Sequence, residues 1–96
     1  MYMVLSKWEF DPAYEAEVFD SAEKMMTTIR TWPEVEMAFN IRAGANYVIA
    51  VMGYSDDDAY QRLVHAPGGP FERAAEEHGI ERYAQWIWSE RGERQD

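Results

Sequence analysis

The sequence feature that most limits the possible folds is a nearly continuous apolar run, YVIAVMGY, at residues 47–54. It is far short of the ~20 apolar residues that a membrane-spanning helix needs. A strand that is apolar on both faces is typical of a central strand, covered from both sides. The run follows a short turn at residues 43–46 and the segment VEMAFNIR, in which apolar and more polar residues alternate. We therefore predict a β-hairpin over residues 35–54 whose second strand is central.

Residues 12–31 predict an amphipathic helix. Asp11 suits the N-cap, and Pro12 suits the first helical position because the N–H that it lacks would have no partner there. The helix should stop near Thr31, because the residue before Pro33 disfavours the α conformation. Its apolar residues follow steps of three or four and share one face: Tyr14, Val18, Ala22, Met25, Ile29 and Trp32. That face is expected to lie on a core.

A second helix is predicted after the hairpin. Ser55 as a cap, followed by three aspartates, is typical of a helix start, since negative charge is favoured at a helix N-terminus. The helix must break at the PGGP segment, Pro67–Pro70, because prolines and glycines cannot continue the helical hydrogen-bond ladder. It resumes at Phe71 and ends at Gly79, a natural left-handed C-cap.

Strands are predicted at residues 2–10 and 80–89, which completes the order βαββαβ. We interpret this order as an α+β, ferredoxin-like fold with a four-stranded antiparallel sheet. Both helices lie on one face of the sheet, and the second helix is broken at Pro67–Pro70. A single domain accounts for residues 1–90, and residues 91–96 form a polar C-terminal tail that is expected to fray.

Two helices cover only one face of such a sheet, yet its strands carry apolar side chains on both faces. In the first strand Met3 points away from Val4 and Trp8, and strict alternation places Trp86 and Trp88 on one side of the last strand. An uncovered apolar face of this size is larger than monomers usually expose. We therefore expect a homodimer that packs its two sheets face to face.

Composition narrows the classes of function. The 96 residues carry 18 acidic and 9 basic side chains, a net charge of -9, with no basic cluster, so nucleic acid is not an expected partner. The absence of cysteine excludes disulfides and thiol catalysis. No segment has the length of a membrane span or of a signal-peptide core, so we expect a cytoplasmic protein with no membrane partner.

These patterns resemble the dimeric α/β-barrel superfamily over residues 2–89. The resemblance rests on the βαββαβ order, the opening YMVLSKW followed by Asp11 and Pro12, the PEVE entry to the second strand and the broken HAPGGPF segment. The superfamily includes antibiotic-biosynthesis-type monooxygenases, the ligand-binding domains of leucine-responsive regulators and small uncharacterised bacterial families. The resemblance implies a barrel shared by two subunits, often with a cleft between sheet and helices for a small apolar or aromatic molecule. It implies no single chemistry, because one fold hosts many functions.

Large aromatic and sulfur-containing side chains are the candidate ligand-binding residues, because they offer a large contact area and tryptophan adds an N–H donor. The candidates are Trp8, Trp32, Met52, Tyr54, Trp86 and Trp88. The first and last strands are neighbours in this topology, so three of the tryptophans are expected to cluster. The alternative is that the same residues form a core or a dimer interface, where aromatic residues are also enriched.

His65, just before the helix break, is the candidate catalytic residue, because histidine transfers protons near neutral pH. The alternative is an exposed or capping histidine at a helix end. No metal site is expected, since Asp56–Asp58 point about 100° apart along a helix and suit its first turn. Haem-degrading members of the superfamily carry an asparagine where this chain has Ser6 and Lys7, so we expect neither haem nor another cofactor.

Three functions are compatible with the sequence. The first is a homodimer that binds a small apolar or aromatic molecule between sheet and helices. The second is a cofactor-independent monooxygenase or isomerase acting on an aromatic or polyketide-like substrate, with His65 as proton shuttle. The third is a structural dimer without a ligand. A cavity of roughly 300 Å³ or more, lined by aromatic side chains, would favour the first two.

Overall fold

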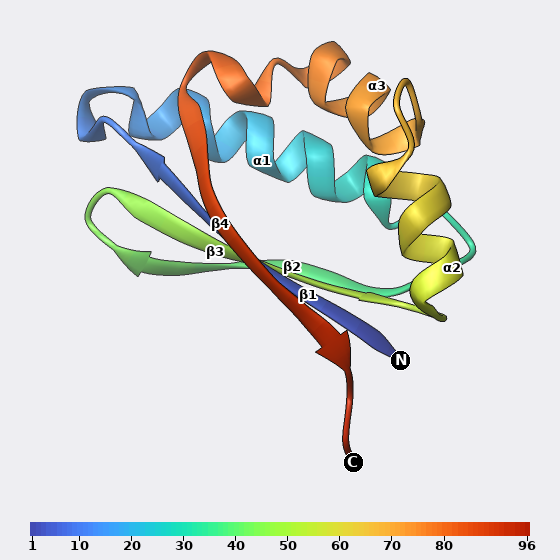
Figure 1. Cartoon of the computed structure of the whole chain (residues 1–96). Helices are drawn as coiled ribbons and strands as arrows, with labels where there is room; N and C mark the ends of the chain where they lie inside the picture. Colours follow the sequence, from blue (N-terminus) through green and yellow to red (C-terminus); the bar gives the residue numbers. More distant parts are fainter.

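Four antiparallel strands form one sheet in the order β2-β3-β1-β4 in a computed structural model that describes all residues, 1–96 (Figure 1). The strands are β1 (Tyr2–Phe10), β2 (Val35–Gly44), β3 (Tyr47–Tyr54) and β4 (Ala84–Glu93). β3 lies between β2 and β1, as its apolar sequence predicts. The ferredoxin-like α+β fold predicted from the sequence is confirmed.

The helical layer lies on one face of the sheet, with α1 and α3 side by side (Figure 1). Its segments are the short 3-10 turn η1 (Pro12–Tyr14), α1 (Glu15–Ile29), α2 (Asp57–Tyr60), the π-helical turn η2 (Gln61–His65), α3 (Pro70–His78) and the 3-10 turn η3 (Ile80–Arg82). The predicted break of the second helix is confirmed, because helical structure stops at His65 and restarts at Pro70. No helix of the chain is both long enough and apolar enough to cross a bilayer.

Local capping fixes where the helices begin and end. Asp11 accepts the Ala13 N–H at 2.9 Å, and Pro12 follows it at the first position, as predicted. At the second helix the cap is Asp56, which accepts the Ala59 N–H at 2.8 Å, and not Ser55. The Ser55 N–H instead donates to the Glu34 carbonyl, which ties the end of β3 to the loop before β2.

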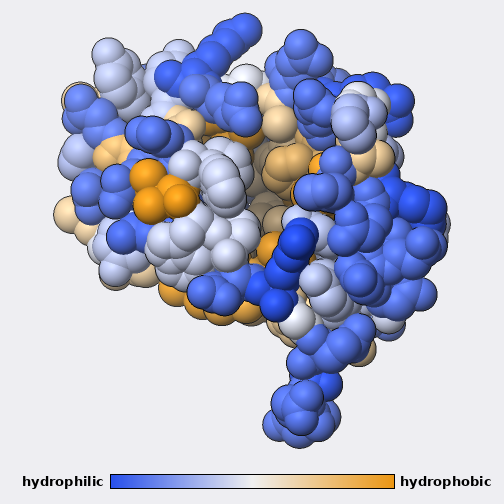
Figure 2. Space-filling model, viewed as in Figure 1, coloured by the Kyte–Doolittle hydropathy of each residue, from blue (hydrophilic) through white to orange (hydrophobic).

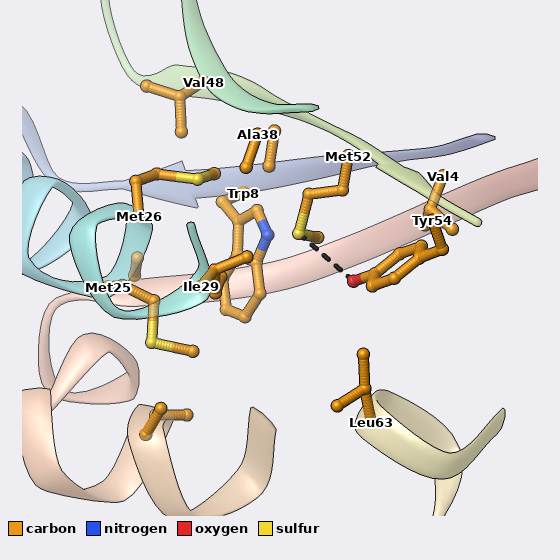
Figure 3. Close-up of a cluster of buried hydrophobic side chains, with 14 of the residues drawn as sticks. Val4, Trp8, Met25, Met26, Ile29, Ala38, Val48, Met52, Tyr54 and Leu63 are labelled. Atoms are coloured by element: carbon orange, nitrogen blue, oxygen red, sulfur yellow. Dashed lines mark hydrogen bonds between the residues drawn. The ribbon is translucent and has the colours of Figure 1, made fainter. Parts of the chain in front are cut away.

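The core lies between the sheet and the helices (Figure 3). Alternate residues of β1 and β3 point toward the helices and are buried; they are Val4, Ser6, Trp8 and Phe10 in β1 and Val48, Ala50, Met52 and Tyr54 in β3. From α1 the buried apolar face contributes Val18, Ala22, Met25, Met26 and Ile29. The spacing of three and four predicts this face except for Met26, which is an addition, and Tyr14, which is exposed.

The last strand is displaced along the chain from its predicted position. Residues 80–82 form η3, because the left-handed Gly79 (φ 64°) turns the chain and its carbonyl accepts the Arg82 N–H. β4 therefore begins at Ala84 and runs to Glu93, which pairs with Tyr2. Three residues of the predicted polar tail are thus part of the strand.

A β-bulge interrupts the pairing of β4 with β1. Trp8 lies opposite Trp86 and Lys7 lies opposite Trp88, so Ile87 is one extra residue in β4. Paired residues share a face of the sheet, which places Trp86 with Trp8 on the helix-covered face and Trp88 with Lys7 on the other. The predicted clustering of all three tryptophans is therefore wrong, because strict alternation does not hold across a bulge.

The face that the helices leave uncovered is apolar along two rows of paired residues. One row is Phe39, Val51, Leu5 and Glu90, and the next is Ile41, Ile49, Lys7 and Trp88. We call this surface, with the neighbouring Met3 and Met37, the outer face. Four of its large side chains are 38–46% exposed: Leu5, Phe39, Ile41 and Trp88.

Candidate functional site

A cleft of about 500 Å³ opens between the helix-covered face of the sheet and the segments α2, η2 and α3. Figure 2 shows it as a hollow with apolar walls beside β4. Its lining residues come from β1, β3, β4 and the helical segments α2, η2, α3 and η3: Val4, Ser6, Trp8, Met52, Tyr60, Val64, Phe71, Glu72, Ala75, Glu76, Glu81, Trp86 and Ser89. The break at residues 66–69 positions Phe71 against this space by letting α3 start in a new direction.

Two tryptophans from paired strands form part of the wall. Trp8 is 9% exposed and belongs to the core, whereas Trp86 is 55% exposed at the edge strand. The Trp86 indole is nevertheless held in place, because its Nε1–H donates to Ser89 Oγ at 2.9 Å. An aromatic ring fixed at the mouth of a cleft is a suitable surface for a planar apolar ligand.

Two hydrogen-bonded pairs lie at the cleft, Ser6 with Ser89 and the lining Tyr60 with Arg91, which is itself not a lining residue. Ser6 Oγ and Ser89 Oγ lie 2.7 Å apart in a hydrogen bond between paired positions of β1 and β4. At the other side, Arg91 Nη1 donates to the Tyr60 hydroxyl at 2.7 Å, and the guanidinium lies 4.9 Å from the Tyr60 ring centre. This contact raises the pKa of Arg91 through its hydrogen bond to Tyr60, so Arg91 stays charged.

Three carboxylates, Glu72, Glu76 and Glu81, border the cleft, and no lysine, arginine or histidine is among its lining residues. Glu72 has a structural task, since it accepts the Gly68 N–H at 2.6 Å and so supports the turn before α3. The carboxylates give the mouth of the cleft a negative charge, which opposes the entry of anions.

The structure brings three of the six predicted ligand-binding residues to the cleft, namely Trp8, Met52 and Trp86. Trp88 lies on the outer face. Trp32 is half-buried, packs against the core after α1 and does not line the cleft. Trp32 thus has the core position that the alternative describes, whereas an interface role for Trp88 stays a prediction.

Tyr54 is fully buried and also lies outside the cleft lining. Its hydroxyl donates to Met52 Sδ at 3.4 Å, and Figure 3 shows this contact deep between sheet and helices. Burial, and to a lesser extent the neighbouring Tyr60, raises the pKa of Tyr54 well above its usual range. Tyr54 is therefore a neutral core residue that supports Met52 and Tyr60 from behind.

The two histidines lie away from the cleft. His65 is exposed at the end of η2, with its ring centre 6.5 Å from that of Tyr60, and is not among the lining residues. Its catalytic role stays a prediction that its position does not favour. His78 ends α3, and its Nε2 lies 2.8 Å from Thr28 Oγ1, which joins α3 to α1.

Three polar residues of the cleft, namely Tyr60, Ser6 and Ser89, were not predicted from the sequence. Tyr60 follows Ala59 and precedes Leu63 at helical spacing, so a core position is the simplest interpretation of its pattern. Ser6 had one signal, since it is a polar residue among apolar ones on the inward side of β1. Elsewhere, Lys7 Nζ and Glu9 Oε2 form an ion pair at 3.5 Å. No three metal-ligating side chains gather at one place.

Comparison with known proteins places this architecture. No family model and no curated protein matches the sequence. Solved structures do match: SnoaB, a cofactor-independent oxygenase from Streptomyces nogalater, aligns with a TM-score of 0.72 and 14% identity over 99% of this chain and 93% of its own. An antibiotic biosynthesis monooxygenase aligns over the whole of both chains with a TM-score of 0.77 and 12% identity. The chain has the fold of these domains.

A third structure with this fold is tetracenomycin F2 cyclase from Streptomyces glaucescens, a type-II polyketide cyclase. It has a TM-score of 0.62 and 22% identity over 100% of this chain and 95% of its own. The predicted resemblance to antibiotic-biosynthesis-type ferredoxin-like domains is confirmed at the level of fold. At these identities the chemistry of the cleft must be argued from the residues of this chain.

Proposed function

We propose that this protein is a homodimer that binds one small, largely apolar and aromatic molecule per subunit in the cleft. The observation that carries the proposal is the cleft itself. Its volume of about 500 Å³ lies within the ~300–1,000 Å³ of typical small-molecule sites, and apolar and aromatic side chains form most of its wall. A purely structural dimer is expected to fill such a space with side chains, because protein interiors are closely packed.

The dimer part of the proposal rests on the outer face. Leu5, Phe39, Ile41 and Trp88 present apolar side chains together on a face that no helix covers. A second copy offers the same surface, so two outer faces can bury each other around a two-fold axis. The cleft lies on the opposite side of the sheet and stays open in such a dimer.

A neutral fluorescent probe, N-phenyl-1-naphthylamine, tests the binding proposal. We expect one probe per subunit and a weaker complex in Val64→Phe, which fills the cleft from η2. The matched control is Tyr14→Ser, an exposed aromatic residue beside Tyr83 and away from the cleft. Equal probe binding in wild type and Val64→Phe would contradict the proposal. Native mass spectrometry of protein from its own host would report the subunit number and any retained ligand together.

A second candidate function is a cofactor-independent oxygenase or isomerase of aromatic or polyketide-like molecules. It is favoured by the Tyr60–Arg91 pair, because Arg91 occupies the acceptor side of the Tyr60 hydroxyl and leaves its proton for a ligand oxygen in the cleft. A hydrogen-bond donor beside a charged guanidinium stabilises negative charge that develops on such an oxygen. Tyr60 is therefore a better candidate than His65 for the acid of such a reaction.

Oxygen uptake with a panel of aromatic quinols tests this second candidate. Tyr60→Phe should lower turnover by at least tenfold while binding changes little, and His65→Ala should leave turnover unchanged. A loss of turnover in His65→Ala with normal Tyr60→Phe activity would restore the original assignment. No oxygen uptake with any quinol in the wild type would contradict the oxygenase.

A further inference from the structure

The two hydroxyl groups of the Ser6–Ser89 pair, on the wall of the cleft, have one proton that no hydrogen bond within the protein takes up. A serine hydroxyl has one proton to donate and lone pairs that accept. The bond between Ser6 Oγ and Ser89 Oγ consumes one of the two protons, whichever serine donates it. Trp86 Nε1–H adds a bond in which Ser89 Oγ is again the acceptor. Neither hydroxyl has another partner within the protein, so one proton remains in either arrangement.

The position of this free hydroxyl proton lets it donate a hydrogen bond to a ligand in the cleft. Ser6 is only 5% exposed, whereas Ser89 is exposed, and both serines line the cleft as a pair next to the paired Trp8 and Trp86. Polar groups at buried positions are almost always hydrogen-bonded, so an apolar ligand that displaced water here would leave the proton unpaired, at a cost. A ligand that brings an acceptor to this point avoids that cost.

We propose that Ser6 and Ser89 bind the carbonyl oxygen of a neutral aromatic ketone whose ring lies against Trp86. This inference rests on the proposed binding function of the cleft and specifies the ligand for it. The carbonyl is preferred to an anionic oxygen because Glu72, Glu76 and Glu81 border the cleft and no cation is among its lining residues. Arg91, the partner of the lining Tyr60, is already bonded to that hydroxyl. The Trp86–Ser89 bond couples the two parts of the site, since one hydroxyl orients both the ring and the acceptor.

Two matched probes isolate the carbonyl: 1-tetralone and tetralin, which differ only in that oxygen. Dissociation constants come from NMR titrations of the full chain, followed at the tryptophan indole N–H signals. The quantity compared is the preference for tetralone over tetralin. In Ser6→Ala/Ser89→Ala we expect this preference to fall by about 3- to 10-fold, the value of one net hydrogen bond, while tetralin affinity is retained. Retained tetralin affinity also shows that the variant has folded with its cleft intact.

The number of hydroxyl protons left in each single-serine variant predicts how much of the tetralone preference it keeps. In Ser6→Ala the Ser89 hydroxyl no longer donates to Ser6, so it keeps its own proton for the ligand, and Ser89→Ala leaves the proton of Ser6. Each single variant should therefore retain more of the tetralone preference than the double variant. Ser21→Ala is the control, because Ser21 is a buried serine of α1 that does not line the cleft.

An unchanged tetralone preference in the double variant would overturn the acceptor site while leaving the binding function in place. If neither probe bound the wild type, the binding function itself would fail, and the acceptor site with it. A third probe, the anion 1,2,3,4-tetrahydro-1-naphthoate, tests the effect of the carboxylates and is expected to bind several-fold more weakly than tetralone at low salt. Equal or tighter binding of this anion would contradict the choice of a neutral ketone.

Discussion

The inner and outer faces of the sheet differ in what covers them. On the inner face Val4, Trp8 and Met52 pack under the helices, and the space left beside them is the cleft. On the outer face Phe39, Ile41 and other side chains of similar size have no cover within the chain. The same strands supply both sets, because alternate residues point to opposite sides. One face therefore stabilises the subunit, and we infer that the other joins two subunits.

The bulge at Ile87 decides how the aromatic residues of β4 are shared between the two faces. Without an extra residue, Trp86 and Trp88 would follow each other on one side. With it, Trp86 borders the cleft and Trp88 joins the outer face. The two tryptophans thus offer a direct means to test the division of roles.

The largest effect is expected from removing an inner tryptophan. Trp8→Ala should lower the free energy of unfolding by about 3–5 kcal/mol, because it leaves a cavity in the core. Trp88 is already 39% exposed, so Trp88→Ala should lower the free energy of unfolding of the separated subunit by less than about 1 kcal/mol. Urea unfolding followed by circular dichroism, at a concentration low enough to separate the subunits, measures both. Similar losses of stability in the two variants would contradict the claim that the inner face, and not the outer face, stabilises the subunit.

Charge on the outer face should separate the subunits. Ile41→Asp places a carboxylate in the middle of the proposed interface, where burying an unpaired charge is costly. We expect at least a 100-fold weaker dimer, seen by light scattering as a shift from about twice 11.2 kDa to 11.2 kDa. Tyr14→Asp, on an exposed aromatic residue elsewhere, is the control and should remain dimeric. A wild type of 11.2 kDa at micromolar concentration would contradict the dimer outright.

Ligand affinity should depend on the tryptophan that borders the cleft and not on the tryptophan of the outer face. Trp86→Ala removes a wall of the cleft and should weaken 1-tetralone binding by about tenfold, as aromatic contacts at binding sites typically do. Trp88→Ala should change that affinity by less than twofold. An equal loss in both variants would mean that ligand and partner share one surface.

The fold was predictable from the sequence because its signals are local. The alternation in VEMAFNIR, the helical spacing before Ile29, the Asp11 cap and the Pro67–Pro70 break each reflect a neighbour-to-neighbour constraint. The start of the last strand was not predictable from the sequence, because the apolar Ile80 suits a 3-10 turn over the core as well as a strand. The bulge leaves no mark in an alternating sequence.

The candidate site was predictable only in part. Trp8, Met52 and Trp86 carry the signal of large apolar area in adjacent strands, whereas the serine pair depends on a register that the bulge sets. Tyr60 meets Arg91 across 31 positions of sequence, which no local pattern encodes. His65 was chosen for its chemistry, and chemistry alone does not determine which way a residue points at a helix end.

The smallest effect concerns Tyr54 at high pH. Because burial raises its pKa, the folded state holds Tyr54 neutral, and this stability is present below the ordinary tyrosine pKa and lost as pH rises above it. Between pH 10 and 11 the wild type should lose up to about 1.4 kcal/mol more stability than Tyr54→Phe, which has no proton to lose. The same pair compared at pH 7 isolates the lost contact with Met52. Identical pH profiles would show that Tyr54 is not sealed from solvent on the inner face.

The most direct test of the central claim, ligand on the inner face and partner on the outer, is an NMR titration of the four tryptophan indole N–H signals with 1-tetralone. The four tryptophans report three environments: Trp8 and Trp86 line the cleft, Trp32 packs outside it and Trp88 lies on the outer face. If the ligand binds on the inner face, the signals of Trp8 and Trp86 move together along one binding curve while those of Trp32 and Trp88 stay in place. Movement confined to Trp88, or larger there than at Trp86, would contradict this claim.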